Sequence, residues 1–169
     1  MLSIDLNRVP AFYHKYIERV NEENVIDAIQ SMHNELSSFL TAIPESKWMH
    51  KYAEDKWTIK ELVQHVTDAE RIFCYRALCF SRNEKSALPG FDENEYVIAS
   101  NANNRSKEQI LDELRTVQAA TLSLFASFTD TQLNAQGIAN GNPIYVKAIG
   151  YIVAGHAIHH MAILKERYL

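Results

Sequence analysis

Apolar residues recur every three or four positions along four stretches of the chain, which is the pattern of an amphipathic α-helix. The first stretch follows Asn21, a residue type suited to capping a helix, and it stops at Pro44. The second begins at Thr58, where Glu61 three positions later gives the spacing of a capping box. Its pattern predicts a helix that continues to about Ser81.

The remaining two stretches lie in the second half of the chain. A third stripe runs from Ser106, which has capping-box spacing with Gln109, to Phe128. Residues 137–142 have the composition of a turn, and their Asn-Gly pair suits a small hairpin. Asn142 followed by Pro143 fits a helix N-cap and first position, so the last helix is expected to run from there almost to the end of the chain.

Four long amphipathic helices with almost no strand signal predict an all-α protein, an up-and-down four-helix bundle. A short N-terminal segment precedes the bundle. A long loop, residues 82–105, separates its second and third helices. No repeat or low-complexity tract divides the chain, so we expect a single domain over 1–169. Long loops inside compact domains are usually functional or mobile, which makes the 82–105 loop a candidate lid.

Composition narrows the classes of function. A formal net charge of -4 provides no basic surface for nucleic acid or an anionic membrane. The longest apolar run, AIGYIVAG, is shorter than the roughly 18 residues that cross a bilayer, and the N-terminal stretch MLSIDLNRVP lacks the pattern of a signal peptide. Cys74 and Cys79 are too few and too close for a disulfide scaffold. We therefore expect a soluble cytoplasmic protein with a small-molecule substrate, and a homodimer is plausible for so apolar a bundle.

Three histidines crowd into the segment GHAIHHMAIL near the C-terminus. Residues four apart on a helix project within about 40° of each other, so His156 and His160 share one face, as the histidines of HExxH zinc sites do. Isoleucines flank that face, which predicts that it points into the core. His159 projects away from the face that His156 and His160 share, so it is expected to pack against neighbouring residues or to contact a ligand histidine from outside the metal site.

The second helix offers a partner for this pair. His65 lies in LVQHVTDAE with apolar residues on its side, so it too should point inward. Three neutral histidines from two helices, with one open position, form a usual catalytic metal site. The alternative is a histidine-rich helix end near the surface, with one ring bonded to a backbone carbonyl and His65 an ordinary core residue. The residues alone leave both interpretations open.

Three segments carry a resemblance to a known family: KWTIKELVQHVTDAERIFCYRALCF, LPGFDENEY, and AIGYIVAG running into HAIHHMAILKERYL. From about Pro44 to Leu169 the chain resembles the DinB superfamily of small helical bundles. In that family one histidine of the second helix and an H-x-x-x-H pair of the last helix bind a divalent metal. The resemblance places these ligands on His65, His156 and His160, and it implies zinc or nickel as the metal.

The resemblance also implies a reaction class. Branches of this family are linked to transfer of a low-molecular-weight thiol to an electrophile, and others are assigned as hydrolases of small substrates. A metal-dependent transferase or hydrolase is therefore expected, with such a thiol as a candidate cosubstrate. The alternative is a non-catalytic metal-binding module of a stress response, which would close the metal with a fourth protein ligand.

A metal-dependent reaction also needs groups that carry protons or orient the ligands. Asp68, three residues after His65, is a candidate to orient that imidazole, whereas Glu70 is expected to be a solvated or salt-bridged acid. Asp92 and Tyr96 would reach a substrate if the 82–105 loop folds over the site. The three candidate catalytic residues from sequence are thus Asp68, Asp92 and Tyr96.

Overall fold

The computed structural model describes residues 4–169, so the first three residues of the N-terminal stretch MLSIDLNRVP lie outside it. The four long helices are α2 (Val25–Ala42), α3 (Ile59–Ser81), α5 (Lys107–Ala126) and α7 (Val146–Arg167). The shorter elements are α1 (His14–Ile17), α4 (Glu93–Ser100), α6 (Asp130–Leu133), β1 (Gln136–Ala139) and β2 (Asn142–Tyr145). Short 3-10 turns occupy Leu6–Arg8, Ala11–Tyr13, Glu45–Lys47 and Ala102–Asn104.

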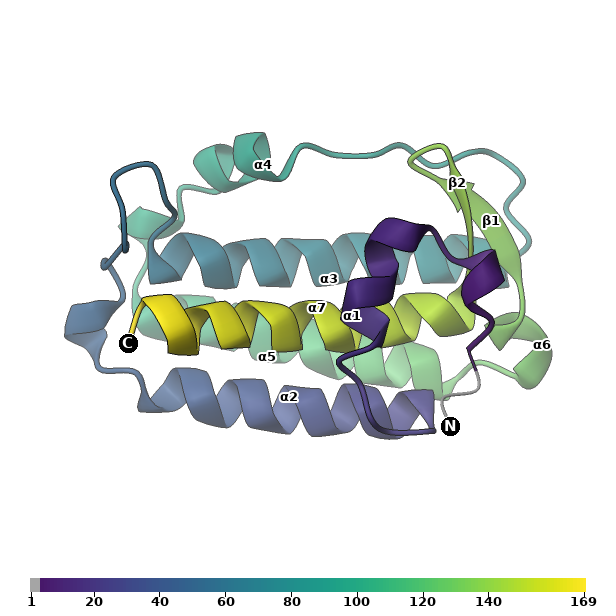
Figure 1. The fold of residues 1–169 in the computed structure, drawn as a ribbon, viewed down its shortest axis with the longest axis horizontal. Helices are drawn as coiled ribbons and strands as arrows, with labels where there is room; N and C mark the ends of the chain where they lie inside the picture. Colours follow the sequence, from purple (N-terminus) through teal and green to yellow (C-terminus); the bar gives the residue numbers. More distant parts are fainter. Residues whose placement is uncertain (1–3) are drawn as a thin grey trace.

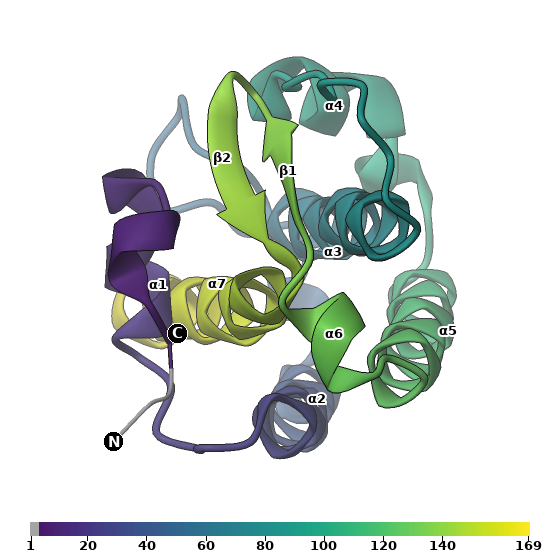
Figure 2. The ribbon, with the colours of Figure 1, turned by 90° about the vertical axis from the view of Figure 1, so that its right-hand side faces the viewer.

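The predicted four-helix bundle is confirmed, with α2, α3, α5 and α7 side by side along one axis (Figure 1). In the end-on view, α2 packs between α5 and α7, and α3 lies on the other side of the same two helices (Figure 2). The connection that carries α4 returns along the whole length of the bundle, so α3 and α5 run in the same direction and the order of the helices departs from the up-and-down arrangement that was expected (Figure 1). This connection brings α4 over α3, where a lid was expected.

The helix ends follow local hydrogen-bonding rules. Capping boxes start α3 at Thr58 and α5 at Ser106, as predicted. The start of α2 was predicted too early: Asn24, not Asn21, caps it, and its side chain accepts from the Ile26 amide at 2.7 Å.

The start of the last helix was also predicted too early, because residues 142–145 pair with residues 136–139 in a hairpin. The turn of that hairpin is Asn140-Gly141, where both residues have positive φ (50° and 73°). Two successive left-handed residues are the requirement of a type I′ turn, which favours Asn-Gly. The hairpin expected from the sequence is therefore present. Because its second strand ends at Tyr145, the last helix begins at Val146.

The mostly apolar interior contains several buried polar side chains, among them a pair that joins α2 to α3. His33 Nε2 lies 3.0 Å from Glu70 Oε1, and both side chains are almost fully buried. Of the two alternatives expected for Glu70, a solvated acid is wrong, because the side chain is buried and paired with His33 on the facing helix. No helix within residues 4–169 combines the length and the apolar character needed to cross a membrane.

The N-terminal segment covers one side of the bundle, with α1 against α7 (Figure 1). Gly155 allows this close approach: a Cβ atom there would lie 2.0 Å from the Tyr16 carbonyl oxygen. Because the obstacle is backbone, it cannot rotate away as a side chain could. The segment before the bundle is thereby seated next to His156, the residue that follows Gly155 in the chain.

Candidate metal centre

Three imidazoles from two helices converge at the middle of the bundle. His65 projects from α3, and His156 and His160 project from successive turns of α7. The Nε2 atom of His156 lies 3.2 Å from that of His65 and 3.1 Å from that of His160. Within residues 4–169, this is the one group of three His, Cys, Asp or Glu residues whose ligand atoms all lie within 4.8 Å of one another. The structure therefore brings together the three histidines that the sequence singled out.

The spacing fits a shared cation better than hydrogen bonds alone. A neutral Nε2 carries one N–H or one in-plane lone pair, so His156 can make only one of its two short contacts as a proper hydrogen bond. Two nitrogens on one tetrahedral zinc, each at about 2.0–2.1 Å, lie roughly 3.3 Å apart. The separations of 3.2 and 3.1 Å are close to this value. The cluster thus fits a divalent metal.

Burial keeps these imidazoles neutral, which leaves lone pairs for a metal. It lowers the pKa of His65 from 6.5 to about 4, with a small opposing effect from the Glu93 carboxylate. Burial and the neighbouring His65 ring lower the pKa of His160 to about 3. The pKa of His156 falls well below 6.5 because of burial and then because of the adjacent His160 ring. All three rings are in the form that binds divalent ions at neutral pH.

Metal-free protein is expected to lose stability as the pH falls from about 6.5 toward 4. Burial holds the pKa of His65 at about 4 in the folded chain, whereas an unfolded chain has its ordinary value. Between these values the unfolded chain binds more protons, so the free energy of unfolding decreases as the pH falls. The loss at pH 5 is roughly 2 kcal/mol for the His65 imidazole.

Urea unfolding of chelator-treated protein at about pH 7 and about pH 5 measures this loss. The variant His65→Gln, which cannot titrate at that position, should lose less stability over the same interval. Equal stability of the unmodified metal-free protein at both pH values would contradict the neutral, buried state of the cluster.

The triad forms part of the wall of a surface cavity of about 310 Å³. Aromatic rings surround the imidazoles on three sides: Trp57 lies 4.9 Å from the His65 ring, Tyr16 5.4 Å from the His156 ring, and Phe73 5.8 Å from the same ring. The cavity is lined by Phe12, Tyr13, Lys15, Tyr16, Trp57, His65, Ala69, Phe73, Phe91, Glu93, His156, His159 and His160. Its walls are apolar apart from the histidines and a few polar groups, as in small-molecule sites.

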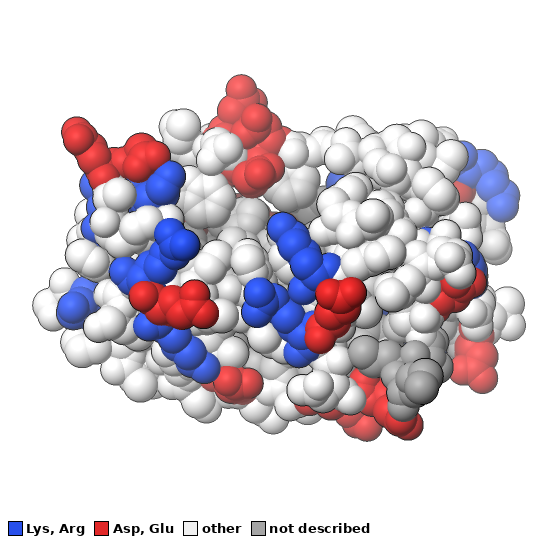
Figure 3. Space-filling view, in the orientation of Figure 1, with Lys and Arg blue, Asp and Glu red and all other residues white. Residues whose placement is uncertain are grey.

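Two opposite charges stand at this cavity. Glu93, in the first turn of α4, is close enough for its charge to act on the His65 imidazole. Lys15 holds its ammonium 4.9 Å from the Tyr16 ring centre, and its charge lowers the pKa of His156. In Figure 3, the acidic side chains of α4 and the basic side chains beside α1 lie on either side of a hollow in the surface.

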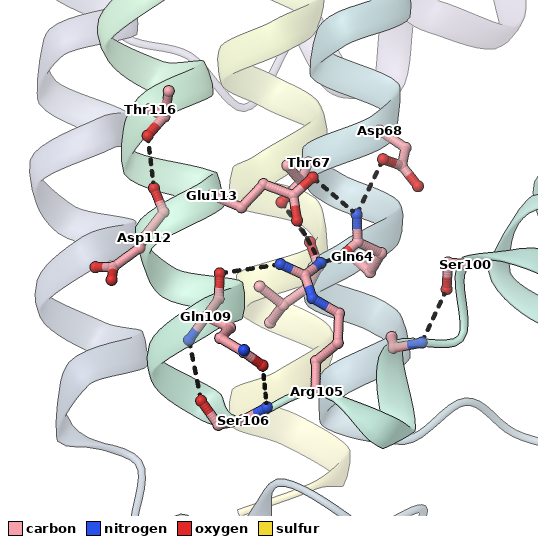
Figure 4. A network of polar contacts seen from close by, with 12 residues as sticks. Gln64, Thr67, Asp68, Ser100, Arg105, Ser106, Gln109, Asp112, Glu113 and Thr116 are labelled. Carbon is pink, nitrogen blue, oxygen red and sulfur yellow. Dashed lines mark hydrogen bonds and ion pairs between the residues drawn. The ribbon is translucent and has the colours of Figure 1, made fainter.

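Of the predicted catalytic residues, Asp68 lies in a different environment. Its Oδ1 atom accepts from Gln64 at 3.0 Å and from Arg71 at 3.3 Å. These groups continue into a polar network with Glu113 and Arg105 between α3 and α5 (Figure 4). Asp68 is therefore bound to Gln64 and Arg71 of its own helix, and it borders a hollow beside α4 rather than the cavity beside the triad.

Asp92 and Tyr96 also stand apart from the triad. The Asp92 carboxylate caps α4 by accepting from the amides of Asn94 and Glu95 at 2.9 and 3.0 Å. Tyr96 packs on Phe91, with ring centres 5.1 Å apart, and borders a separate hollow between α3 and α4. Their side chains are held by α4 itself, and neither is among the residues that line the triad cavity.

Sequence reasoning missed Glu93, although a signal for it was present. Asp92 followed by Glu95 resembles a capping spacing, which predicts that a helix begins at Glu93, whereas the direction of the Glu93 side chain depends on how α4 packs on α3. It also missed the wall formed by Tyr13 and Tyr16. Those residues lie in short 3-10 and helical turns without periodicity, so no pattern in the sequence pointed to them.

The free thiol nearest the site is not placed to react there. Cys74 does not line the cavity, and its Sγ lies 3.2 Å from the Thr121 hydroxyl on α5. Burial raises the pKa of this thiol to about 12. It is therefore a packing residue, as expected for a small buried side chain.

The fold and the site together define a class of protein: a four-helix bundle with three neutral imidazoles at an open cavity, a site that fits a divalent metal. The chain belongs to the DinB superfamily, whose family model matches residues 28–164. The expectation drawn from the sequence is confirmed.

Relatives of known sequence or structure agree with this membership. A protein of Oceanobacillus iheyensis is 24% identical over 152 residues, which cover 88% of this chain and 87% of that protein; one of Geobacillus thermodenitrificans is 24% identical over 169 residues, with 96% and 94% covered. Both carry the provisional name of metal-dependent hydrolase.

Solved structures share the fold. YfiT from Bacillus subtilis, described as a probable metal-dependent hydrolase with an unusual four-helix bundle topology, superposes with a TM-score of 0.74 at 18% identity, covering 84% of this chain and 82% of its own. A mycothiol-dependent maleylpyruvate isomerase superposes with a TM-score of 0.71 at 11% identity, covering 86% of this chain and 61% of that longer chain.

Proposed function

We propose that this protein is a divalent-metal-dependent enzyme that hydrolyses a small substrate at the histidine triad. The observation that carries the proposal is the meeting of three neutral Nε2 atoms in the wall of an open cavity. A structural metal is closed by a fourth protein ligand, whereas a catalytic one keeps a position open. Within residues 4–169, no fourth His, Cys, Asp or Glu joins the cluster.

The lining of the cavity supports a nucleophile that comes from outside the chain. No serine, threonine or cysteine lines it among the described residues, and the Cys74 thiol faces α5. When bound, a divalent metal acts as a Lewis acid and lowers the pKa of an attacking group at neutral pH. That attacking group is water in the proposed hydrolysis.

The remaining wall residues have separate tasks in this proposal. Tyr16 packs edge-on against both His156 and His159 and holds the α7 face of the site in place. Trp57 packs against His65 and restricts water on the other side. Glu93, the carboxylate of the cavity, accepts the proton that the nucleophile releases.

The absence of serine, threonine and cysteine from the described lining also favours a second candidate, transfer of a low-molecular-weight thiol to an electrophile. The thiol would then take the place of water. The name of the mycothiol-dependent isomerase supports this candidate for the fold, although that protein is only 11% identical. A cytoplasmic location, where such thiols are reduced, is part of the same proposal.

Two assays separate the candidates. Protein purified without a histidine tag is first analysed for metal content, and it is then supplied with a panel of aryl esters and, separately, with electrophiles plus cysteine, coenzyme A or other small thiols. Metal-dependent ester cleavage without thiol supports the hydrolase, and consumption of electrophile only with thiol supports the transferase. A cluster that carries no metal and takes up none on dialysis would overturn both.

Replacing Glu93 with Gln is expected to lower kcat by about a hundredfold or more, because proton transfer by a positioned carboxylate contributes on this scale. Metal content should stay at the wild-type level, since Glu93 is not part of the cluster of ligand atoms. Steady-state kinetics and elemental analysis of the same preparations measure both quantities. Glu95→Gln, on the same helix but outside the cavity lining, is the matched control. Unchanged kcat in Glu93→Gln would remove the carboxylate from the mechanism.

A further inference from the structure

The cavity has a second polar region away from the histidines. Along α3, His65, Ala69 and Phe73 line it on successive turns, a span of about 12 Å at 1.5 Å per residue. The Phe73 ring contacts both the His156 ring, at 5.8 Å, and the Tyr13 ring, at 6.0 Å. Phe73 therefore separates the triad from Tyr13, whose phenol is the polar group of this far region.

A buried cation lies directly behind Tyr13. Arg76, one turn after Phe73 on α3, is only 4% exposed, and its Nη2 atom donates to the Pro89 carbonyl oxygen at 2.9 Å. No Asp or Glu of residues 4–169 forms an ion pair with it. A buried guanidinium without a carboxylate is costly, and such groups are usually matched by an anion.

The Tyr13 hydroxyl connects this charge to the cavity. The Arg76 guanidinium is close enough for its charge to act on the Tyr13 phenol, and as a group with donors only it can donate to the phenol oxygen but cannot accept the phenol proton. The phenol keeps its own proton, because burial raises the pKa of Tyr13 despite the opposing effect of the guanidinium. Among the described residues, no acceptor is hydrogen-bonded to that proton. A donor polarised by a cation is thus available to an oxygen atom in the cavity.

We propose that the Tyr13 hydroxyl, supported by the buried Arg76 guanidinium, binds a carboxylate of the substrate at the end of the cavity opposite the triad. The substrate is then a small anionic molecule whose reactive group lies at the histidines and whose carboxylate lies at Tyr13. A single hydroxyl backed by a single guanidinium matches one negative charge, which suits a carboxylate better than a dianionic phosphate. This inference rests on the proposed function in taking the cavity as the substrate site.

Binding of simple acids tests the proposal without catalysis. Calorimetric titrations with succinate, glutarate and adipate are compared with butanoate, pentanoate and hexanoate, which lack the second carboxylate. At least one dicarboxylate should bind about tenfold more tightly than its partner of equal length, because a hydrogen bond to a charged group is worth at least this factor. Tyr13→Phe, which deletes one oxygen atom, should abolish the difference, and Arg76→Gln should do the same.

Lys15→Gln is the matched control, because it removes the cation at the cavity mouth and should retain the preference. Loss of the preference there, and not in Tyr13→Phe, would overturn the assignment. Equal binding of dicarboxylates and monocarboxylates by the wild type would also overturn it. If Arg76→Gln fails to fold, Tyr13→Phe decides. The titrations are repeated after chelation: butanoate should still bind the wild type more tightly than Tyr13→Phe in protein without metal, and this difference supports the anion site even where metal analysis has refuted the proposed function.

Discussion

Replacing His156 with Ala is expected to abolish stoichiometric metal binding, with affinity reduced on the order of a hundredfold or more. Its Nε2 atom is the one within 3.2 Å of both other ligand nitrogens, so its removal leaves two imidazoles on different helices. Two nitrogen ligands without a third hold a divalent ion weakly. Elemental analysis of untagged protein after gel filtration, with metal counted per chain, measures the loss.

His159→Ala is the matched control for this variant. His159 lies on the same helix and lines the same cavity, but it is outside the cluster of ligand atoms. Metal content should remain near the wild-type level. His160→Ala should behave like His156→Ala, and His65→Ala likewise. Wild-type metal content in all three triad variants would mean that the metal is held elsewhere.

Gly155→Ala is expected to destabilise the fold by about 1–3 kcal/mol or more, as an overpacked core does. The new Cβ atom would meet the Tyr16 carbonyl oxygen at 2.0 Å and the carbonyl carbon at 2.4 Å. Because this contact is between backbones, α1 has to move away from α7, and the Tyr16 ring moves away from His156 with it. Urea unfolding gives the change in stability.

The sign of the stability change in Gly155→Ala serves as a control. Glycine to alanine in an unobstructed helix interior stabilises a protein by up to about 1 kcal/mol, so a gain in stability would show that α1 does not press on Gly155. Limited proteolysis adds a local measurement: cleavage near residues 10–20 should become faster in the variant. An unchanged cleavage rate together with lower stability would place the strain elsewhere in the bundle.

The helices were predictable because their signals are local. The apolar stripes, and the capping boxes at Thr58 and Ser106, depend on residues within one or two turns. The parallel orientation of α3 and α5 has no such local signal, because it depends on the path of the long connection between these two helices (Figure 1). The buried pair of His33 and Glu70 was missed for the same reason: its members are far apart in sequence and meet only after α2 and α3 pack.

The candidate site could likewise be predicted where its signals are local, and it was missed where residues meet only through packing. The spacing of His156 and His160 indicates their shared face, the apolar neighbours of His65 indicate that it points inward, and the resemblance to a known family joins the three as ligands. Glu93 is the carboxylate that shares the cavity with them, whereas the predicted candidates Asp68, Asp92 and Tyr96 do not line it. Glu93 was missed because the direction of an exposed carboxylate leaves no periodic pattern in the sequence. A part for any of these acids in the reaction stays a prediction.

The wall that carries Tyr13, Lys15 and Tyr16 precedes residue 28, where the match to the family model begins. In the proposed enzyme, two tasks would therefore belong to separate stretches of the chain: the bundle would supply the reactive centre, and the leading segment would supply much of the surface that selects the substrate. Such a division makes substrate preference exchangeable. Grafting the segment that precedes α2 from one bundle of this kind onto another would redirect the choice of substrate while leaving the metal-binding histidines untouched.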